Sequence, residues 1–135
     1  MKQVTFMFFF ALLFIGCGRH AYNKNKSNVS IDKLHGDWTF VRIYGSAITE
    51  VDTLTKELGK TAFISRVTYN EDGTYIFKNC YRAEGKYNVN KENYIIKETQ
   101  GSDAVIGRIT YLDDSYLLIL FDEKTSPITY FYKRD

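Results

Sequence analysis

The amino-acid sequence predicts an all-β protein, a small antiparallel barrel of eight strands in up-and-down order. Aromatic residues make up 16% of the 135 residues, with 11 Tyr and 10 Phe, and aromatic rings suit the pleated, half-buried surface of a sheet. From residue 37 onward, short alternating segments are separated by Gly, Asn, Asp and Ser. Most connections are too short for parallel crossovers, so neighbouring strands are antiparallel, and closing the meander removes exposed edges.

The first predicted strand shows the alternation that defines the others. Trp38, Phe40 and Tyr44 lie on one face, and Val41 and Ile43 lie on the other. This period of two is typical of a strand that borders a core. The eight predicted strands cover residues 37–44, 61–69, 74–80, 82–89, 93–99, 104–112, 116–121 and 128–133.

Turn residues join the strands in order. Residues 70–73 separate the second and third strands, and Asp72 with Gly73 at the tip predicts a β-hairpin. Gly85 interrupts the fourth strand and predicts a β-bulge. Further along the chain, residues 101–102 and 113–115 are typical turn segments.

The longest connection, residues 46–59, carries a helical signal. Val51, Leu54 and Leu58 are spaced at i, i+3 and i+7, as on one face of a helix. This spacing predicts a short helix near residues 49–58, lying across one mouth of the barrel. An irregular loop is the alternative.

Residues 1–16 have the pattern of a signal peptide. Lys2 gives a positive start, and residues 4–15 are almost wholly apolar. A helix of that length rises about 18 Å, whereas the hydrocarbon core of a bilayer is about 30 Å thick. The segment is therefore predicted to be an export signal rather than a permanent membrane span.

The end of this segment, residues 14–17, reads Phe-Ile-Gly-Cys and resembles the lipobox of bacterial lipoproteins. The resemblance implies cleavage before Cys17 and lipid attached to its sulfur, which makes the membrane a partner. An ordinary secretory signal that contains a cysteine is the alternative. Residues 17–31 are predicted to be the lipidated cysteine and a flexible, polar tether.

The residue after the lipobox cysteine is Gly18. By the same resemblance, an Asp at this position would retain the protein at the inner membrane. The resemblance therefore implies an outer-membrane protein that faces the periplasm, with surface exposure as the alternative. Cys80 is left unpaired by the lipidation of Cys17 and is predicted to be a small buried hydrophobe.

The domain at residues 32–135 opens with Leu34, Gly36 and Trp38 as a Leu-x-Gly-x-Trp motif. With the Asn-Glu-Asp-Gly turn and the closing Tyr-Phe-Tyr-Lys-Arg, it resembles the small lipocalin-like domains of Bacteroidetes lipoproteins. The resemblance implies that Gly36 lets the chain turn into the barrel and that Trp38 plugs its closed end. It also implies that Arg134 caps the indole.

Ligand binding is the first of two functional hypotheses. Eight-stranded barrels either are filled by side chains or hold one small ligand, and the resemblance implies a small apolar or amphipathic ligand. The alternative is a filled barrel that acts as a protein-interaction or envelope-assembly module with an unknown protein partner. The candidate ligand-binding residues are Phe40, Phe63, Val67, Tyr69, Tyr75 and Phe77.

No catalytic, metal-binding or cofactor-binding pattern is present in the sequence. His20 and His35 have no partner at metal-ligand spacing, and there is no glycine-rich phosphate loop. We therefore expect no enzymatic activity, no metal and no cofactor. Lys and Arg total 18 against 16 Asp and Glu, which lacks the basic character of a nucleic-acid binder.

Overall fold

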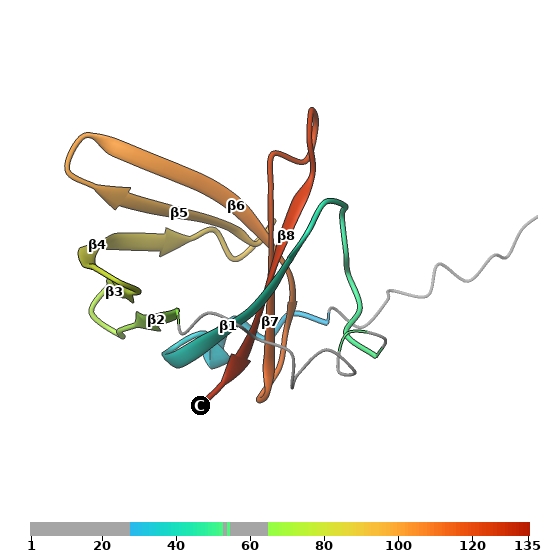
Figure 1. Cartoon of the computed structure of the whole chain (residues 1–135), viewed down its shortest axis with the longest axis horizontal. Helices are drawn as coiled ribbons and strands as arrows, with labels where there is room; N and C mark the ends of the chain where they lie inside the picture. The colour runs from blue at the N-terminus through green and yellow to red at the C-terminus, as the bar shows by residue number, and fades with distance from the viewer. Residues whose placement is uncertain (1–27, 53, 55–64) are drawn as a thin grey trace, which may run out of the picture.

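The computed structural model describes residues 28–52, 54 and 65–135, which form a closed barrel (Figure 1). Each strand pairs antiparallel with the next, and β8 pairs with β1. The strands are β1 (Gly36–Tyr44), β2 (Arg66–Tyr69), β3 (Thr74–Lys78), β4 (Arg82–Val89), β5 (Ile95–Gln100), β6 (Asp103–Leu112), β7 (Tyr116–Phe121) and β8 (Ile128–Arg134). The predicted all-β, eight-stranded, up-and-down barrel is confirmed.

Backbone irregularities lie elsewhere than predicted. The register shifts between Phe40 and Arg42 in β1 and between Ile109 and Tyr111 in β6. Gly85, by contrast, pairs in regular register with Tyr75, so the predicted bulge is wrong. A Cβ at Gly85 would lie 2.7 Å from the Tyr75 ring and 2.2 Å from a backbone oxygen of β5. The glycine is needed for close packing of that ring.

The inner face of the barrel holds the main hydrophobic core. Its buried side chains come from every strand except β4, which contributes partly buried residues, and are joined by Leu34 from before β1. The largest of them are aromatic, which accords with the composition of the chain. The buried members are Leu34, Trp38, Val67, Tyr69, Tyr75, Ile96, Ile109, Leu112, Leu117, Ile119 and Tyr132.

A second core lies on the outer face of β1, β7 and β8. Val41, Leu118 and Phe131 alternate with inward-facing neighbours and are buried beneath Val51 and Leu54. The described part of the connection after β1 therefore covers the outside of the barrel, and in Figure 1 it descends beside these strands. This explains why β7, Tyr-Leu-Leu-Ile-Leu-Phe, is apolar on both faces.

Only part of the helix predicted near residues 49–58 falls within the described residues. Residues 49–51 form no helix, and the only helical feature among the described residues of this stretch is a tight turn in which the Leu54 N–H donates to the Val51 carbonyl at 2.8 Å. This part packs on the outer face of the barrel, not across its mouth. The connection is attached through Thr129, whose buried hydroxyl donates to the Ser46 carbonyl at 2.7 Å and accepts from the Ile48 N–H at 3.1 Å.

The N-terminal part of the described chain docks beside β6. The Leu112 N–H donates to the Asn28 carbonyl at 2.8 Å, and the Ser30 N–H donates to the Leu112 carbonyl at 3.0 Å. A short 3₁₀ helix, η1 (Ile31–Lys33), then leads into β1. The tether predicted over residues 17–31 is therefore packed on the barrel from residue 28 onward. The predicted signal peptide and Cys17 lie outside the described residues.

The two ends of the barrel differ. Helix η1 and the turns at 70–73, 90–94 and 113–115 lie at one end, called here the closed end. The turns at 79–81, 101–102 and 122–127 lie at the other, called the open end. Cys80 is exposed in an open-end turn, so the prediction of a buried thiol was wrong. The strand stops at Lys78, two residues before the cysteine.

Candidate functional site

A cavity of about 330 Å³ occupies the barrel interior toward the open end. Its size is at the lower limit of small-molecule pockets, which span about 300–1,000 Å³. All strands except β1 contribute to its lining, because side chains at alternate positions point inward. The lining residues are Val67, Tyr69, Tyr75, Phe77, Tyr81, Ala83, Glu98, Gln100, Val105, Phe121, Tyr130 and Tyr132.

Four of the six candidate ligand-binding residues line this cavity, namely Val67, Tyr69, Tyr75 and Phe77. Phe40 does not. Its ring packs edge-on against Tyr130 and Tyr132, at centroid distances of 5.9 and 5.8 Å, and so supports two lining residues. Phe63 lies outside the described residues.

Among the described residues that line this cavity, Glu98 is the one charged side chain. The Tyr69 hydroxyl donates a hydrogen bond to its Oε1 atom. Burial raises the pKa of Glu98 from its ordinary value, and the hydrogen bond from Tyr69 opposes that rise. Sequence analysis missed this residue, although a signal was present: Glu98 is two residues from buried Ile96, at an inward position where an apolar residue is the norm.

The tyrosines around Glu98 remain neutral. Burial, and then the negative charge of Glu98, raise the pKa of Tyr69 well above its ordinary value of 10.0. The same two causes raise the pKa of Tyr75 and the pKa of Tyr132. The described lining of the cavity therefore combines aromatic surface, neutral hydroxyls and a single carboxylate.

The closed end is built around Trp38, which is fully buried. Its indole N–H donates to the Leu34 carbonyl at 2.8 Å. The guanidinium carbon of Arg134 lies 4.2 Å from the centroid of the indole ring, close enough for a cation–π contact. Gly36 has a φ of +120°, and a Cβ there would lie 2.7 Å from Nη1 of Arg134. The glycine thus provides both the turn and the space for the guanidinium.

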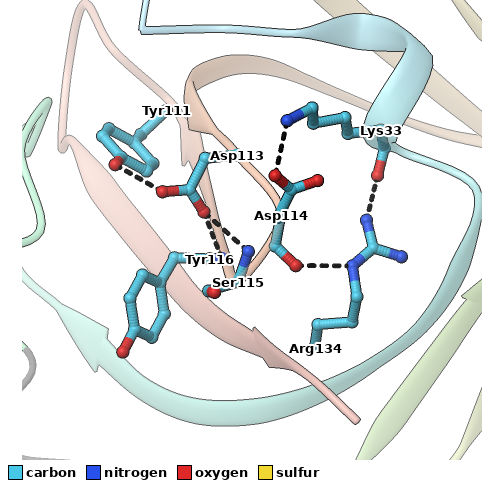
Figure 2. A network of polar contacts seen from close by, with 7 residues as sticks. All are labelled: Lys33, Tyr111, Asp113, Asp114, Ser115, Tyr116 and Arg134. Carbon is cyan, nitrogen blue, oxygen red and sulfur yellow. Dashed lines mark hydrogen bonds and ion pairs between the residues drawn. The ribbon is translucent and has the colours of Figure 1, made fainter.

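Arg134 also ties η1 to the turn between β6 and β7, as Figure 2 shows in part. Its guanidinium donates to three backbone carbonyls: those of Asp114 and His35, both at 2.9 Å, and that of Lys33. Lys33 in turn forms an ion pair with Asp114 at 2.7 Å. All three guanidinium nitrogens are hydrogen-bonded, so Arg134 has a structural role and is not available to a ligand.

Asp113 completes the network in Figure 2. Its carboxylate accepts the Tyr111 hydroxyl and the backbone N–H groups of Ser115 and Tyr116, each at 2.7 Å. Partial burial favours a higher pKa for Asp113, but these hydrogen bonds and the nearby Lys33 hold the pKa below its ordinary value of 3.8. The bond to Asp113 raises the pKa of Tyr111 to about 12.

Residues 28–52, 54 and 65–135 contain no group of three or more His, Cys, Asp or Glu side chains arranged to hold a metal ion. No helix within these residues has the length and apolar character needed to cross a membrane.

Comparison with known proteins establishes the fold. No protein-family model matches the chain, and a search of curated proteins finds no match. Among solved structures, the crystal structure of a DUF4847 family protein from Bacteroides vulgatus is similar, with a TM-score of 0.51 and 15% sequence identity. The match covers 72% of this chain and 92% of that chain. At this identity the likeness supports a shared small lipocalin-like barrel fold and carries no function with it.

Proposed function

We propose that this protein is a non-enzymatic binding protein that holds a small apolar or amphipathic ligand inside its barrel. The observation that carries the proposal is the cavity of about 330 Å³, in which aromatic rings surround one carboxylate. A largely apolar pocket with a few polar groups directed into it is the usual form of a small-molecule site. A barrel serving only as a scaffold needs no such space, because side chains then fill the interior.

The alternative, a protein-interaction or envelope-assembly module, draws support from the outer face of β5 and β6. Ile95 and Ile106 are exposed there, beside a hollow of about 360 Å³ that Leu120 also lines. Scattered exposed apolar residues are normal on protein surfaces, however. A partly buried carboxylate directed into an aromatic cavity is uncommon on a barrel that serves only as a scaffold, so we prefer ligand binding.

We further propose that lipid on Cys17 anchors the protein to the outer membrane, facing the periplasm. The apolar segment at residues 4–15 and the Gly-Cys pair after it support this anchor. Residue 28 joins the barrel at its closed end, beside Leu112. A tether attached there leaves the open end free to face the aqueous compartment, from which a ligand can enter.

Native mass spectrometry tests both parts of the proposal. The full chain is purified in mild detergent from cells that make it naturally, and its mass is measured before and after denaturation. We expect a covalent lipid mass that survives denaturation and a stoichiometric ligand mass that does not. Cys17→Ser should remove only the first.

A matched pair of variants localises the ligand. Ala83 is buried and lines the cavity, whereas Lys86, in the same strand, is exposed. Ala83→Phe should abolish the non-covalent mass because the new ring occupies the cavity, while Lys86→Phe should retain it. A bare protein mass, or a ligand mass that survives Ala83→Phe in folded protein, contradicts the binding proposal.

A further inference from the structure

We propose that the ligand of this cavity is an organic cation, an ammonium group on a compact apolar body, whose charge lies against Glu98 and the neighbouring tyrosine rings. This inference rests on the proposed function and specifies its ligand class. Three observations carry it: an isolated carboxylate, a ring of aromatic side chains, and the absence of a compensating cation among the described residues that line the cavity.

The carboxylate of Glu98 is only partly satisfied. Tyr69 donates one hydrogen bond to Oε1. Within residues 28–52, 54 and 65–135, Glu98 has no second hydrogen bond and no ion pair, and no Lys, Arg or His lines the cavity. An ionised carboxylate has about four acceptor sites, so most of its capacity is open to a ligand. A group that donates hydrogen bonds and carries positive charge fits this position.

Aromatic rings adjoin the carboxylate on several sides. Tyr69 and Tyr75 come from β2 and β3, with ring centroids 6.5 Å apart, and Tyr130 and Tyr132 come from β8, with centroids 6.3 Å apart. The faces of aromatic rings are negative and attract cations, most strongly where water is excluded. These rings and Glu98 therefore favour the same sign of charge, and their apolar carbon atoms can pack against the body of the ligand.

The electrostatics disfavour the other two ligand classes. An anion would be repelled by Glu98. A neutral ligand would displace water from the carboxylate without replacing its interactions, and an unpaired buried charge is costly. Burial raises the pKa of Glu98 from its ordinary value. A bound cation favours the ionised form, so it should lower that pKa and bind more tightly as pH rises through it.

The groups that face Glu98 do not complicate this pH dependence. They are Tyr69 from β2, Tyr75 from β3, Tyr87 from β4, which pairs directly with Glu98, and Tyr132 from β8, and each has a pKa raised above 10.0. Their hydroxyls therefore stay protonated over the range in which Glu98 titrates. Any change in cation affinity between mildly acidic and neutral pH is then attributable to Glu98.

Three water-soluble probes with the same ring test the inference on the full chain. Benzyltrimethylammonium carries a permanent positive charge, benzyl alcohol is neutral, and benzoate is negative. Dissociation constants are measured by calorimetric titration in one detergent buffer. At neutral pH we expect the cation to bind about tenfold or more tightly than the alcohol, and benzoate to bind least. Affinity for the cation should fall as the buffer is acidified.

Glu98→Gln is the decisive variant, because an amide oxygen still accepts the Tyr69 hydrogen bond but carries no charge. We expect a loss of about tenfold or more in affinity for the cation and little change for benzyl alcohol. Glu84→Gln, which removes an exposed carboxylate from β4, should alter neither affinity. Thermal unfolding verifies that both variants are folded.

The outcomes separate this inference from the proposed function. Equal affinities for the three probes, or a Glu98→Gln protein that keeps the preference for the cation, overturn the inference while the binding proposal stands. Failure of all three probes to bind also overturns it, and the native mass measurement then decides the binding proposal independently. A non-covalent ligand mass that proves to be an anionic lipid would contradict the inference as well.

Discussion

Each end of this barrel contains a carboxylate that accepts a hydrogen bond from a tyrosine, yet the two carboxylates have opposite properties. At the closed end, Asp113 accepts from Tyr111 and from two backbone N–H groups, and its pKa is lowered. Inside the cavity, Glu98 accepts from Tyr69 alone, and its pKa is raised. Hydrogen bonds outweigh burial in the first case, and burial outweighs the hydrogen bond in the second.

The residues at the closed end stabilise the fold. Glu98 does not, which is consistent with a role in ligand binding instead. At the closed end the indole, the guanidinium and the carboxylate have their hydrogen bonds satisfied within the chain, as stable polar networks require. Glu98 is partly buried with most of its hydrogen-bonding capacity unused, an arrangement that lowers stability. Local exceptions of this kind are expected at functional sites. Four substitutions test the comparison, in order of decreasing effect on the free energy of unfolding.

Trp38→Ala should have the largest effect, a loss of about 3–5 kcal/mol. The indole is fully buried, hydrogen-bonded to Leu34 and stacked on Arg134, so its removal leaves a void at the closed end. Urea denaturation measures the change. Trp38→Phe is the control and should lose less, because it retains an aromatic ring. A loss below about 1 kcal/mol would show that Trp38 does not anchor this end.

Arg134→Lys should cost about 1–3 kcal/mol although it preserves the charge. A lysine cannot reach three backbone carbonyls in the fork geometry of the guanidinium, nor stack on the indole in the same way. Arg66→Lys, at a largely exposed ion pair with Asp135, is the matched control and should change stability by less than about 0.5 kcal/mol. Equal effects of the two substitutions would refute a special role for Arg134.

Asp113→Asn should lower stability at neutral pH by about 1 kcal/mol or less, since solvent screens this partly exposed group. The pKa of Asp113 is lower in the folded state, so its contribution is present above the unfolded pKa and is lost as pH falls through the folded pKa. Denaturation at a series of pH values should therefore show the wild type and the variant converging in acid. Parallel curves would contradict the assignment.

Glu98→Gln should have the smallest effect and the opposite sign, a gain at neutral pH of less than about 1 kcal/mol. The folded pKa of Glu98 lies above its ordinary value of 4.5, so its contribution is fully present below the unfolded pKa. That contribution is lost as pH rises through the folded pKa, and the variant should gain relative to wild type over that window. A variant clearly less stable than wild type at neutral pH would mean that Glu98 is structural after all.

The candidate site was only partly predictable from the sequence. Strand alternation and the hairpin at Asp72 and Gly73 made four lining residues predictable, because the first assigns them to one face and the second sets their pairing. These residues are Val67, Tyr69, Tyr75 and Phe77. Glu98 was overlooked although it occupies an inward position two residues from Ile96, because one acidic residue at such a position does not by itself identify a site. Its partner Tyr69 is 29 residues away, so the contact arises only when the barrel closes.

By itself, the sequence determined the number of strands, the antiparallel order of the strands, the tip of the hairpin at residues 70–73 and the core position of Trp38. Side-chain alternation and turn chemistry decide these features, and both are local properties. The tertiary structure alone decided where the register shifts, why Gly85 is a glycine and that residues 51 and 54 cover the outside of the barrel. It also decided the cavity and the raised pKa of Glu98. These features depend on which distant side chains meet and how much water they exclude, and neither is encoded within a single strand.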